Sequence, residues 1–224
     1  HASSVSEDPA ALQRGAWALR RLSGGPGPET ELGAFLGRQG GESLAERLEG
    51  FNAMIRSASD LHPIVRAAFG FHLWPLAGIG PAGETFEGAV VAARIAAEDV
   101  QGGLVFVPIS MGGGTALQRS GMPEDRLSTW LDGMEQSVRA AGRLLDQLEA
   151  WQATAETATA DLSGRTPGLL IEALRAWPYL SAPMAERLAG VSRAAVRRNL
   201  GEFERRGLVR EVTGHGRFRM WTTA

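Results

Sequence analysis

Apolar residues recur three or four positions apart along most of this chain, which is the spacing that places them on one face of a helix. Leu44, Leu48 and Ile55 form one such set, in a helix that begins near Ser43. Glycine and proline residues interrupt the pattern and mark loops. The pattern predicts a mainly α protein, with further helices over residues 9–22, 30–36, 63–74, 84–97 and 124–158.

Several of these helices begin at residues that suit a first turn. Thr30 is expected to cap the short helix that ends at Leu36. Ser43 is expected to cap the next helix, with Glu46 in the reciprocal position of a capping box. Pro63 fits the first turn of its own helix. The helix over 84–97 has almost no polar interruption, so we expect it at the centre of the core.

The long helix over 124–158 carries one continuous apolar seam, whose residues alternate spacings of three and four: Leu127, Leu131, Met134, Val138, Ala141, Leu145 and Leu148. Such a seam is found in dimerising coiled coils and in long core helices of helical bundles. Three heptads with an alanine in the seam favour the core helix. The Thr-, Ala- and Ser-rich stretch after residue 154 predicts a domain boundary. We expect N-terminal helices over 1–60 packing on a helical body over 61–160, and a separate domain over 166–224.

The last domain has a different pattern. A helix starts at Pro167, and a second, capped by Ser181, ends at Gly190. Ser192 caps a third helix, and residues 207–221 read as two short strands around the turn 213–216. Three helices followed by a small β-hairpin predict a C-terminal winged helix-turn-helix, a module that usually reads DNA.

The third helix of this domain has two distinct faces. Val196, Leu200 and Phe203 share the apolar face. Arginines and small residues occupy the opposite face, a combination that lets a helix enter the major groove of DNA. Adding the helix cap and the arginines of the hairpin gives the predicted DNA-binding residues: Ser192, Arg193, Arg197, Arg198, Arg205, Arg217 and Arg219.

Charge is divided unevenly along the chain. Residues 164–224 hold 11 arginines and 5 glutamates, a net charge of +6, whereas residues 1–163 carry a net charge of −8. A basic end on an acidic body is typical of a DNA-binding module carried by a domain that does not touch phosphate. Glutamates at 202, 204 and 211 dilute the positive face, so a protein-interaction adaptor stays as an alternative.

Composition excludes several kinds of chemistry. The chain has no cysteine, which rules out disulfides, thiolate metal sites and cysteine nucleophiles. His62 and His72 do not have the spacing of zinc ligands, and no metal site is expected. No apolar run reaches the length needed to span a bilayer and no signal peptide is visible, so we expect a soluble, cytoplasmic protein without membrane contacts.

A family resemblance concerns the body. Residues 63–72 (PIVRAAFGFH), 86–97 and 105–110 (VFVPIS) resemble three segments of bacterial Fic-domain proteins: the helix before the catalytic motif, the helix after it and a later Ser-containing segment. Residues 169–221, with LSAPM over 180–184 and GHGRFRMW over 214–221, resemble the helix-turn-helix ends of uncharacterised Fic-like proteins of rhizobia and related α-proteobacteria. The resemblance implies a Fic-like helical bundle before the winged helix-turn-helix.

The catalytic motif of the Fic family is missing. The family motif is His-Pro-Phe-x-Asp/Glu-Gly-Asn-Gly-Arg, whereas this chain reads LWPLAGIGPAGE over 73–84. Transfer of AMP to a hydroxyl needs a base, a cation held by an acid and donors for the phosphate. The resemblance therefore implies a body without catalytic residues or cofactor, and a divergent nucleotidyl transferase stays as the enzyme alternative.

Taken together, the sequence predicts a DNA-binding protein that regulates transcription. Its partner is double-stranded DNA, bound through the winged helix. The body would serve in dimerisation or sensing, so a homodimer is expected. The sequence names no small-molecule effector and no catalytic residue.

Overall fold

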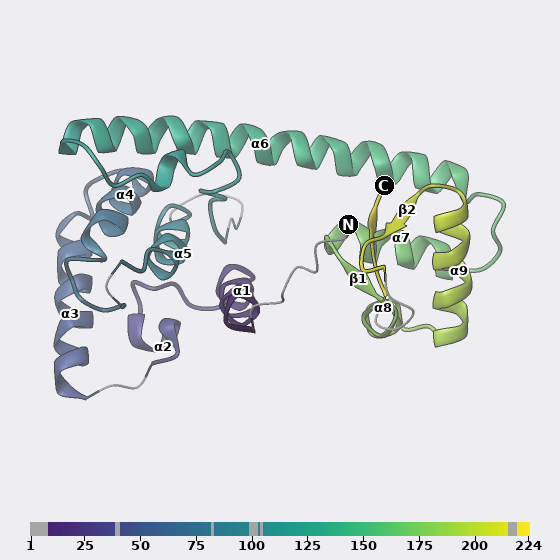
Figure 1. Cartoon of the computed structure of the whole chain (residues 1–224), viewed down its shortest axis with the longest axis horizontal. Coiled ribbons are helices and arrows are strands. Elements are labelled where there is room, and N and C mark those ends of the chain that lie inside the picture. The colour runs from purple at the N-terminus through teal and green to yellow at the C-terminus, as the bar shows by residue number, and fades with distance from the viewer. Residues whose placement is uncertain (1–8, 39–40, 82, 99–102, 104, 215–218) are drawn as a thin grey trace. The chain divides into compact units, whose positions relative to one another are not determined.

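The computed structural model describes residues 9–38, 41–81, 83–98, 103, 105–214 and 219–224. Over these ranges the protein is mainly helical, with a small three-stranded antiparallel sheet near the C-terminal end (Figure 1). This agrees with the predicted mainly α class. None of the helices in the described ranges is long and apolar enough to cross a membrane.

The chain forms two compact units, residues 1–141 and 142–224. This division comes earlier in the sequence than the boundary predicted before residue 166. The reason lies in helix α6 (Pro123–Ala158), which continues through the division. Its first part buries Trp130 in the N-terminal core, and its last turns bury Trp151 in the C-terminal core.

The N-terminal unit is built from short helices and the first part of α6. It contains α1 (Pro9–Leu22), α2 (Leu32–Leu36), α3 (Glu42–Ser57), α4 (Pro63–Leu73), α5 (Phe86–Ile95) and the 3-10 helix η1 (Thr115–Leu117). The starts of α2 and α3 correct two predictions. Neither Thr30 nor Ser43 is the cap residue; Glu31 and Gly41 hold those positions, without a side-chain capping bond. Ser43 Oγ instead accepts a hydrogen bond from Arg47.

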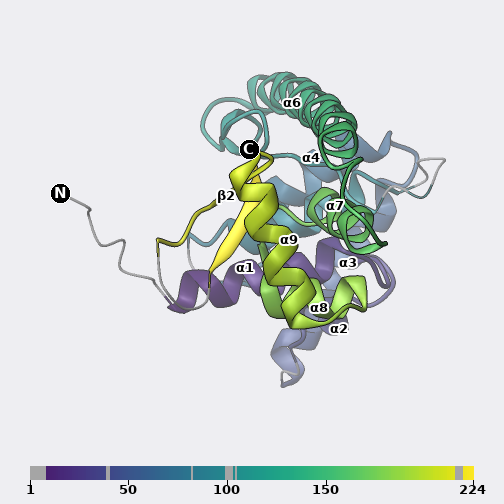
Figure 2. The same ribbon diagram turned by 90° about the vertical axis from the view of Figure 1, so that its right-hand side faces the viewer.

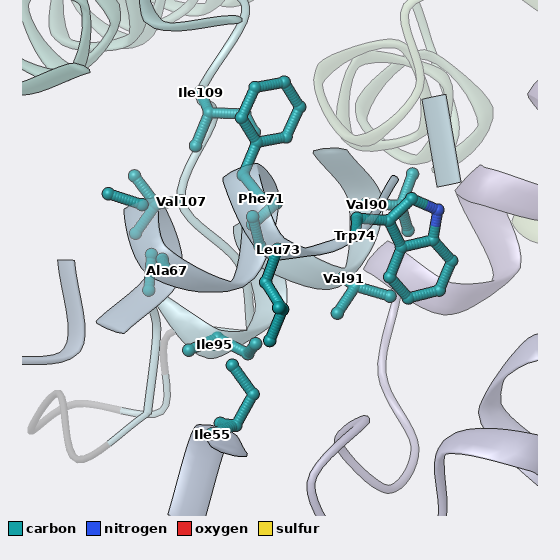
Figure 3. Close-up of a cluster of buried hydrophobic side chains, with 14 of the residues drawn as sticks. Ile55, Ala67, Phe71, Leu73, Trp74, Val90, Val91, Ile95, Val107 and Ile109 are labelled. Carbon is teal, nitrogen blue, oxygen red and sulfur yellow. The ribbon is translucent and has the colours of Figure 1, made fainter. Parts of the chain in front are cut away.

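Helices α4 and α5 pack against each other at the centre of this unit. Figure 3 shows Phe71 and Leu73 of α4, and Val91 and Ile95 of α5, in one apolar cluster that includes Trp74. Close packing depends on Gly88, because a Cβ there would lie 2.7 Å from Cγ of Trp74. As predicted, the apolar helix that ends near residue 97 lies in the core.

Helix α6 closes this core through two close approaches. A Cβ on Gly133 would lie 2.3 Å from the backbone nitrogen of Ala116 in η1, so only glycine allows this contact. The indole of Trp130 is fully buried, and its Nε1 donates a hydrogen bond of 3.0 Å to the carbonyl of Ile64 in α4. Both contacts hold α6 against the other elements of the unit.

The predicted seam of α6 does not form one buried stripe. Met134 is buried, but Leu131, Val138 and Leu145 are 43%, 53% and 61% exposed. The face that packs into the N-terminal core is rotated from the seam, since it carries Trp130 and the buried Ser137. The helix therefore serves as a core helix at Met134, and its exposed seam residues remain consistent with the coiled-coil alternative.

The C-terminal unit alternates helices and short strands. After α6 come α7 (Thr166–Ala176), β1 (Leu180–Ser181), α8 (Ala182–Ala189), α9 (Arg193–Arg205), β2 (Val209–Glu211) and β3 (Met220–Thr223). The strand order in the sheet is β1-β3-β2, all antiparallel, with Leu180 opposite Trp221 and Arg210 opposite Thr222. Figure 2 shows β2 following directly on α9. The pairing of β1 with β3 adds a strand to the two predicted from the sequence.

The core of the C-terminal unit joins α7, α8, α9 and the sheet. Leu170, Leu174, Val196 and Phe203 are almost completely buried there. Trp151 of α6 is buried among them, and its Nε1 donates a hydrogen bond of 2.7 Å to the carbonyl of Leu208. This bond satisfies a backbone acceptor just before β2 and places the last turns of α6 in this unit.

One charged cluster is held inside the N-terminal unit. Arg66 is 6% exposed; its Nη2 lies 2.7 Å from Glu98 and its Nε 3.3 Å from Glu29. Burial, and next the neighbouring Glu29, raise the pKa of Glu98 to about 8. Two half-buried carboxylates lie close together in this cluster, so burial and like charge favour a proton held by Glu98.

Replacing Trp151 tests the bond to Leu208. Trp151→Phe keeps an aromatic ring but removes one of the two donors to the carbonyl of Leu208, the other being the backbone N–H of Ala224. We therefore expect a loss of about 1 kcal/mol in the free energy of unfolding, measured with urea. Trp177→Phe is the matched control, because the half-buried Trp177 makes no hydrogen bond through its indole in the described chain. Equal losses in the two variants would contradict this role of Trp151.

The charged cluster makes stability depend on pH. The folded-state pKa of Glu98, about 8, lies above the unfolded value of roughly 4.3. Between these values the folded protein binds the extra proton, so stability falls as pH rises from about 5 to about 8. Glu98→Gln mimics the protonated carboxyl and should flatten this dependence in thermal unfolding. Glu149→Gln, at an exposed position, should keep it; identical profiles for Glu98→Gln and the unmodified protein would refute the assignment.

Candidate nucleic-acid interface

Helices α8 and α9 are joined by a turn whose conformation depends on a glycine and on the serine that caps the second helix. Gly190 ends α8 with φ of 61°, a left-handed conformation that costs glycine little. Ser181 caps α8 by accepting a hydrogen bond from the backbone N–H of Met184. Ser192 caps α9 in the same way, through Ala195. The predicted caps and the turn at Gly190 are therefore confirmed, and they present the first turn of α9 to solvent.

Helix α9 buries one face and exposes the other. Val196, Leu200 and Phe203 are completely buried, as the sequence pattern predicts. On the opposite face Arg197 and Arg198 are exposed, and neither pairs with a carboxylate in the described part of the chain. Their neighbours on this face, Ala194 and Gly201, are small and exposed, and a Cβ on Gly201 would meet nothing within 4 Å. Small side chains therefore flank the two positive charges on this face.

Arg193, the first residue of α9, is held by an acidic partner. Its Nε lies 2.6 Å from a carboxylate oxygen of Glu186 in α8, and its Nη2 lies 3.5 Å from the other. This pairing raises the pKa of Arg193. The side chain of Arg193 is 61% exposed, so it stays accessible, but its charge is already balanced within the protein.

The last turn of α9 holds a network centred on Glu202. Arg205 and Arg206 both donate to this carboxylate, and these bonds lower the pKa of Glu202 to about 2. Arg206 also donates to Asp161 and to the carbonyl of Ala158, at the end of α6. Its side chain is 19% exposed, against 69% for Arg205. Arg206 therefore binds α9 to the end of α6, while Arg205 lies at the surface with its charge balanced.

The predicted hairpin arginines fall into two groups. Arg217 lies outside the described residues. Arg219 lies 3.1 Å from Glu204 of α9, and its guanidinium stacks 5.0 Å from the ring centroid of Trp221. Arg219 thus joins β3 to α9 and keeps 41% of its side chain exposed.

Among the exposed arginines of this unit that have no carboxylate partner in the described chain, two lie on elements that contact α9, and neither is among the predicted residues. Arg187 lies in the last turn of α8, and Arg210 lies in β2. Helical spacing gives a signal for pairing, because Glu202 precedes Arg205 and Arg206 by three and four residues. Arg187 has no aspartate or glutamate three or four residues away, and this absence is a sequence signal that it has no carboxylate partner in its own helix. The pair of Arg193 with Glu186 crosses a turn and has no such signal.

Among the described residues, no group of three or more histidine, aspartate or glutamate side chains could hold a metal ion. Comparison of the chain with models of known protein families finds no match. No curated protein sequence is significantly similar to it. The resemblance to Fic-domain proteins therefore stays a prediction, and the site has to be judged on its own geometry.

The two neighbouring arginines at the end of α9 should differ in their effect on stability. Arg206→Ala removes bonds to two carboxylates and a carbonyl, so the midpoint of urea unfolding should fall clearly. Arg205→Ala removes a single surface pair and should leave the midpoint close to that of the unmodified protein. If the two substitutions shift the midpoint equally, Arg206 does not have the structural role described.

Proposed function

We propose that this protein binds double-stranded DNA through its C-terminal unit and regulates transcription. The order α7-β1-α8-α9-β2-β3, with the short strand β1 joining the pair β2–β3, supports a winged helix arrangement in which α9 is the recognition helix. Helix α8 and the turn at Gly190 would cross the DNA backbone, and α9 would lie in the major groove.

The observation that carries the proposal is the unpaired state of Arg197 and Arg198. An arginine paired with a carboxylate has its charge partly balanced and attracts a phosphate less strongly, whereas an unpaired one exchanges only water and counterions. The small side chains of Ala194 and Gly201 on the same face permit close approach of the helix to base edges. In the groove, an arginine fork can donate two hydrogen bonds to O6 and N7 of guanine.

The paired arginines take a different part in the proposal. Arg193 and Arg219 are bonded to Glu186 and Glu204, so they position elements around α9 before DNA arrives. Arg187 and Arg210, exposed on α8 and β2, are added as contacts to the DNA backbone. Among the described residues of the interface, the arginines without a carboxylate partner therefore lie on α8, α9 and β2.

A homodimer stays part of the proposal. On α6, Leu131, Val138 and Leu145 are exposed at intervals of seven residues, the spacing of a coiled-coil stripe. In a two-fold dimer the two copies of α9 would have to lie roughly 34 Å apart to reach successive major grooves. The N-terminal unit would then serve association or sensing.

The test is binding of a fluorescent duplex of about three helical turns, followed by anisotropy at a series of salt concentrations. The double variant Arg197→Ala/Arg198→Ala should weaken binding at every salt concentration, because two unpaired cations are lost. The slope of log K against log salt should become shallower by roughly 0.9 for each of the two arginines that contacts a phosphate.

A second double variant controls for net charge. Arg139→Ala/Arg143→Ala removes the same charge from exposed positions on α6 and should keep the slope of the unmodified protein. Equal affinities and equal slopes for the two double variants would overturn the assignment of α9. No binding of the unmodified protein at low salt would overturn DNA binding itself and favour the protein-interaction adaptor.

A further inference from the structure

A cavity of about 350 Å³ opens on the N-terminal unit, between the end of α3, the helix α4 and the first turn of α6. Its wall is apolar, and Leu61, Val65 and Leu127 contribute to it. Leu61 and Phe69 stay 42% and 37% exposed at this cavity. A volume of this size lies at the lower end of the range for small-molecule sites, which are mostly apolar with a few polar groups.

Arg126 is the cationic side chain in the wall of this cavity. Its Nε donates a hydrogen bond of 2.8 Å to the carbonyl of Gly121, which fixes the plane of the guanidinium. In the described ranges no carboxylate pairs with Arg126, and neither terminal nitrogen makes a hydrogen bond. The two terminal nitrogens therefore have the arrangement that receives a carboxylate in a bidentate manner.

The electrostatic surroundings also favour an anion. His72 lies in the wall, and burial, followed by the charges of Arg126 and Arg119, lowers the pKa of His72. The imidazole is thus uncharged at neutral pH, which leaves Arg126 as the positive charge in the wall of the cavity. Both ring nitrogens of His72 are buried without a hydrogen-bond partner in the described chain. None of the side chains that line the cavity is acidic.

We propose that this cavity binds a small carboxylic acid with an apolar body. The carboxylate lies against the guanidinium of Arg126, and the body lies against Leu61, Val65 and Phe69. A single guanidinium balances a single negative charge, so a monocarboxylate fits better than a phosphate ester, which would carry more charge into an apolar wall. This site lies within the N-terminal unit and does not depend on the proposed binding of DNA.

Isothermal titration calorimetry of the full chain with 3-phenylpropanoate and with hexanoate tests the proposal. Each acid is compared with its uncharged amide, which has nearly the same shape. At least one acid should bind, and its amide should bind about tenfold more weakly or not at all, because the amide cannot form the charge-assisted pair. Absence of binding by both acids at millimolar concentration, or equal affinity of acid and amide, would overturn the proposal.

Two variants locate the site. Arg126→Gln should weaken binding of the acid about tenfold and remove the preference over the amide, whereas Arg139→Gln, elsewhere on α6, should change neither. Ser57→Trp places an indole at an exposed position in the wall and should block the cavity, while the neighbouring Ser59→Trp should not. Full affinity in both Arg126→Gln and Ser57→Trp would show that the acid binds elsewhere and would refute the site.

Discussion

The burial of two indole groups on one helix is the constraint on which both units depend. An indole N–H cannot be taken out of water without an acceptor, and Trp130 and Trp151 each find one in a backbone carbonyl. Trp130 bonds to α4 in the first core, and Trp151 bonds to the residue before β2 in the second. Each bond has a required direction, and each indole is surrounded by apolar side chains. Trp130 therefore fixes the orientation of α6 on the first core, and Trp151 fixes the orientation of its last turns on the second. Gly133 adds to this in the first core by allowing α6 to touch the backbone of η1.

Charge in the C-terminal unit is organised by pairing rather than by number. The sequence count of +6 treats all arginines alike. In the folded unit Arg193, Arg205, Arg206 and Arg219 are balanced by glutamate or aspartate. Two of the glutamates that seemed to weaken a DNA-binding face, Glu202 and Glu204, hold Arg205, Arg206 and Arg219 in place. The arginines without a carboxylate partner are the ones that stay available to an outside partner.

Sequence periodicity predicts most of the helices because it reports which face of a helix meets a core. It predicts the caps of α8 and α9 well, since Ser181 and Ser192 stand directly before strongly patterned helices. It is wrong at Thr30 and Ser43, where the helices begin at neighbouring residues. A strand of two residues such as β1 has no period to detect.

The candidate site shows the same limit. That Arg197 and Arg198 lie opposite the apolar face of α9 follows from its 3.6-residue period. That Glu186 pairs with Arg193 across the turn follows only from the three-dimensional arrangement of α8 and α9. The cavity of the N-terminal unit also escapes sequence reasoning, because Ser57, Phe69 and Arg126 come from separate segments.

The place of Trp151 in the second core has a consequence for how this module could be inherited. A DNA segment that encoded only the stretch from α7 onward would lose the indole that fills the core beside α9. It would also lose two partners of Arg206, the carbonyl of Ala158 and the carboxylate of Asp161. Recombination that moved the module between proteins would therefore have to carry the last turns of α6 with it. The unit of exchange in evolution would then be a helix end plus the fold that follows, so the joining point would lie inside a helix.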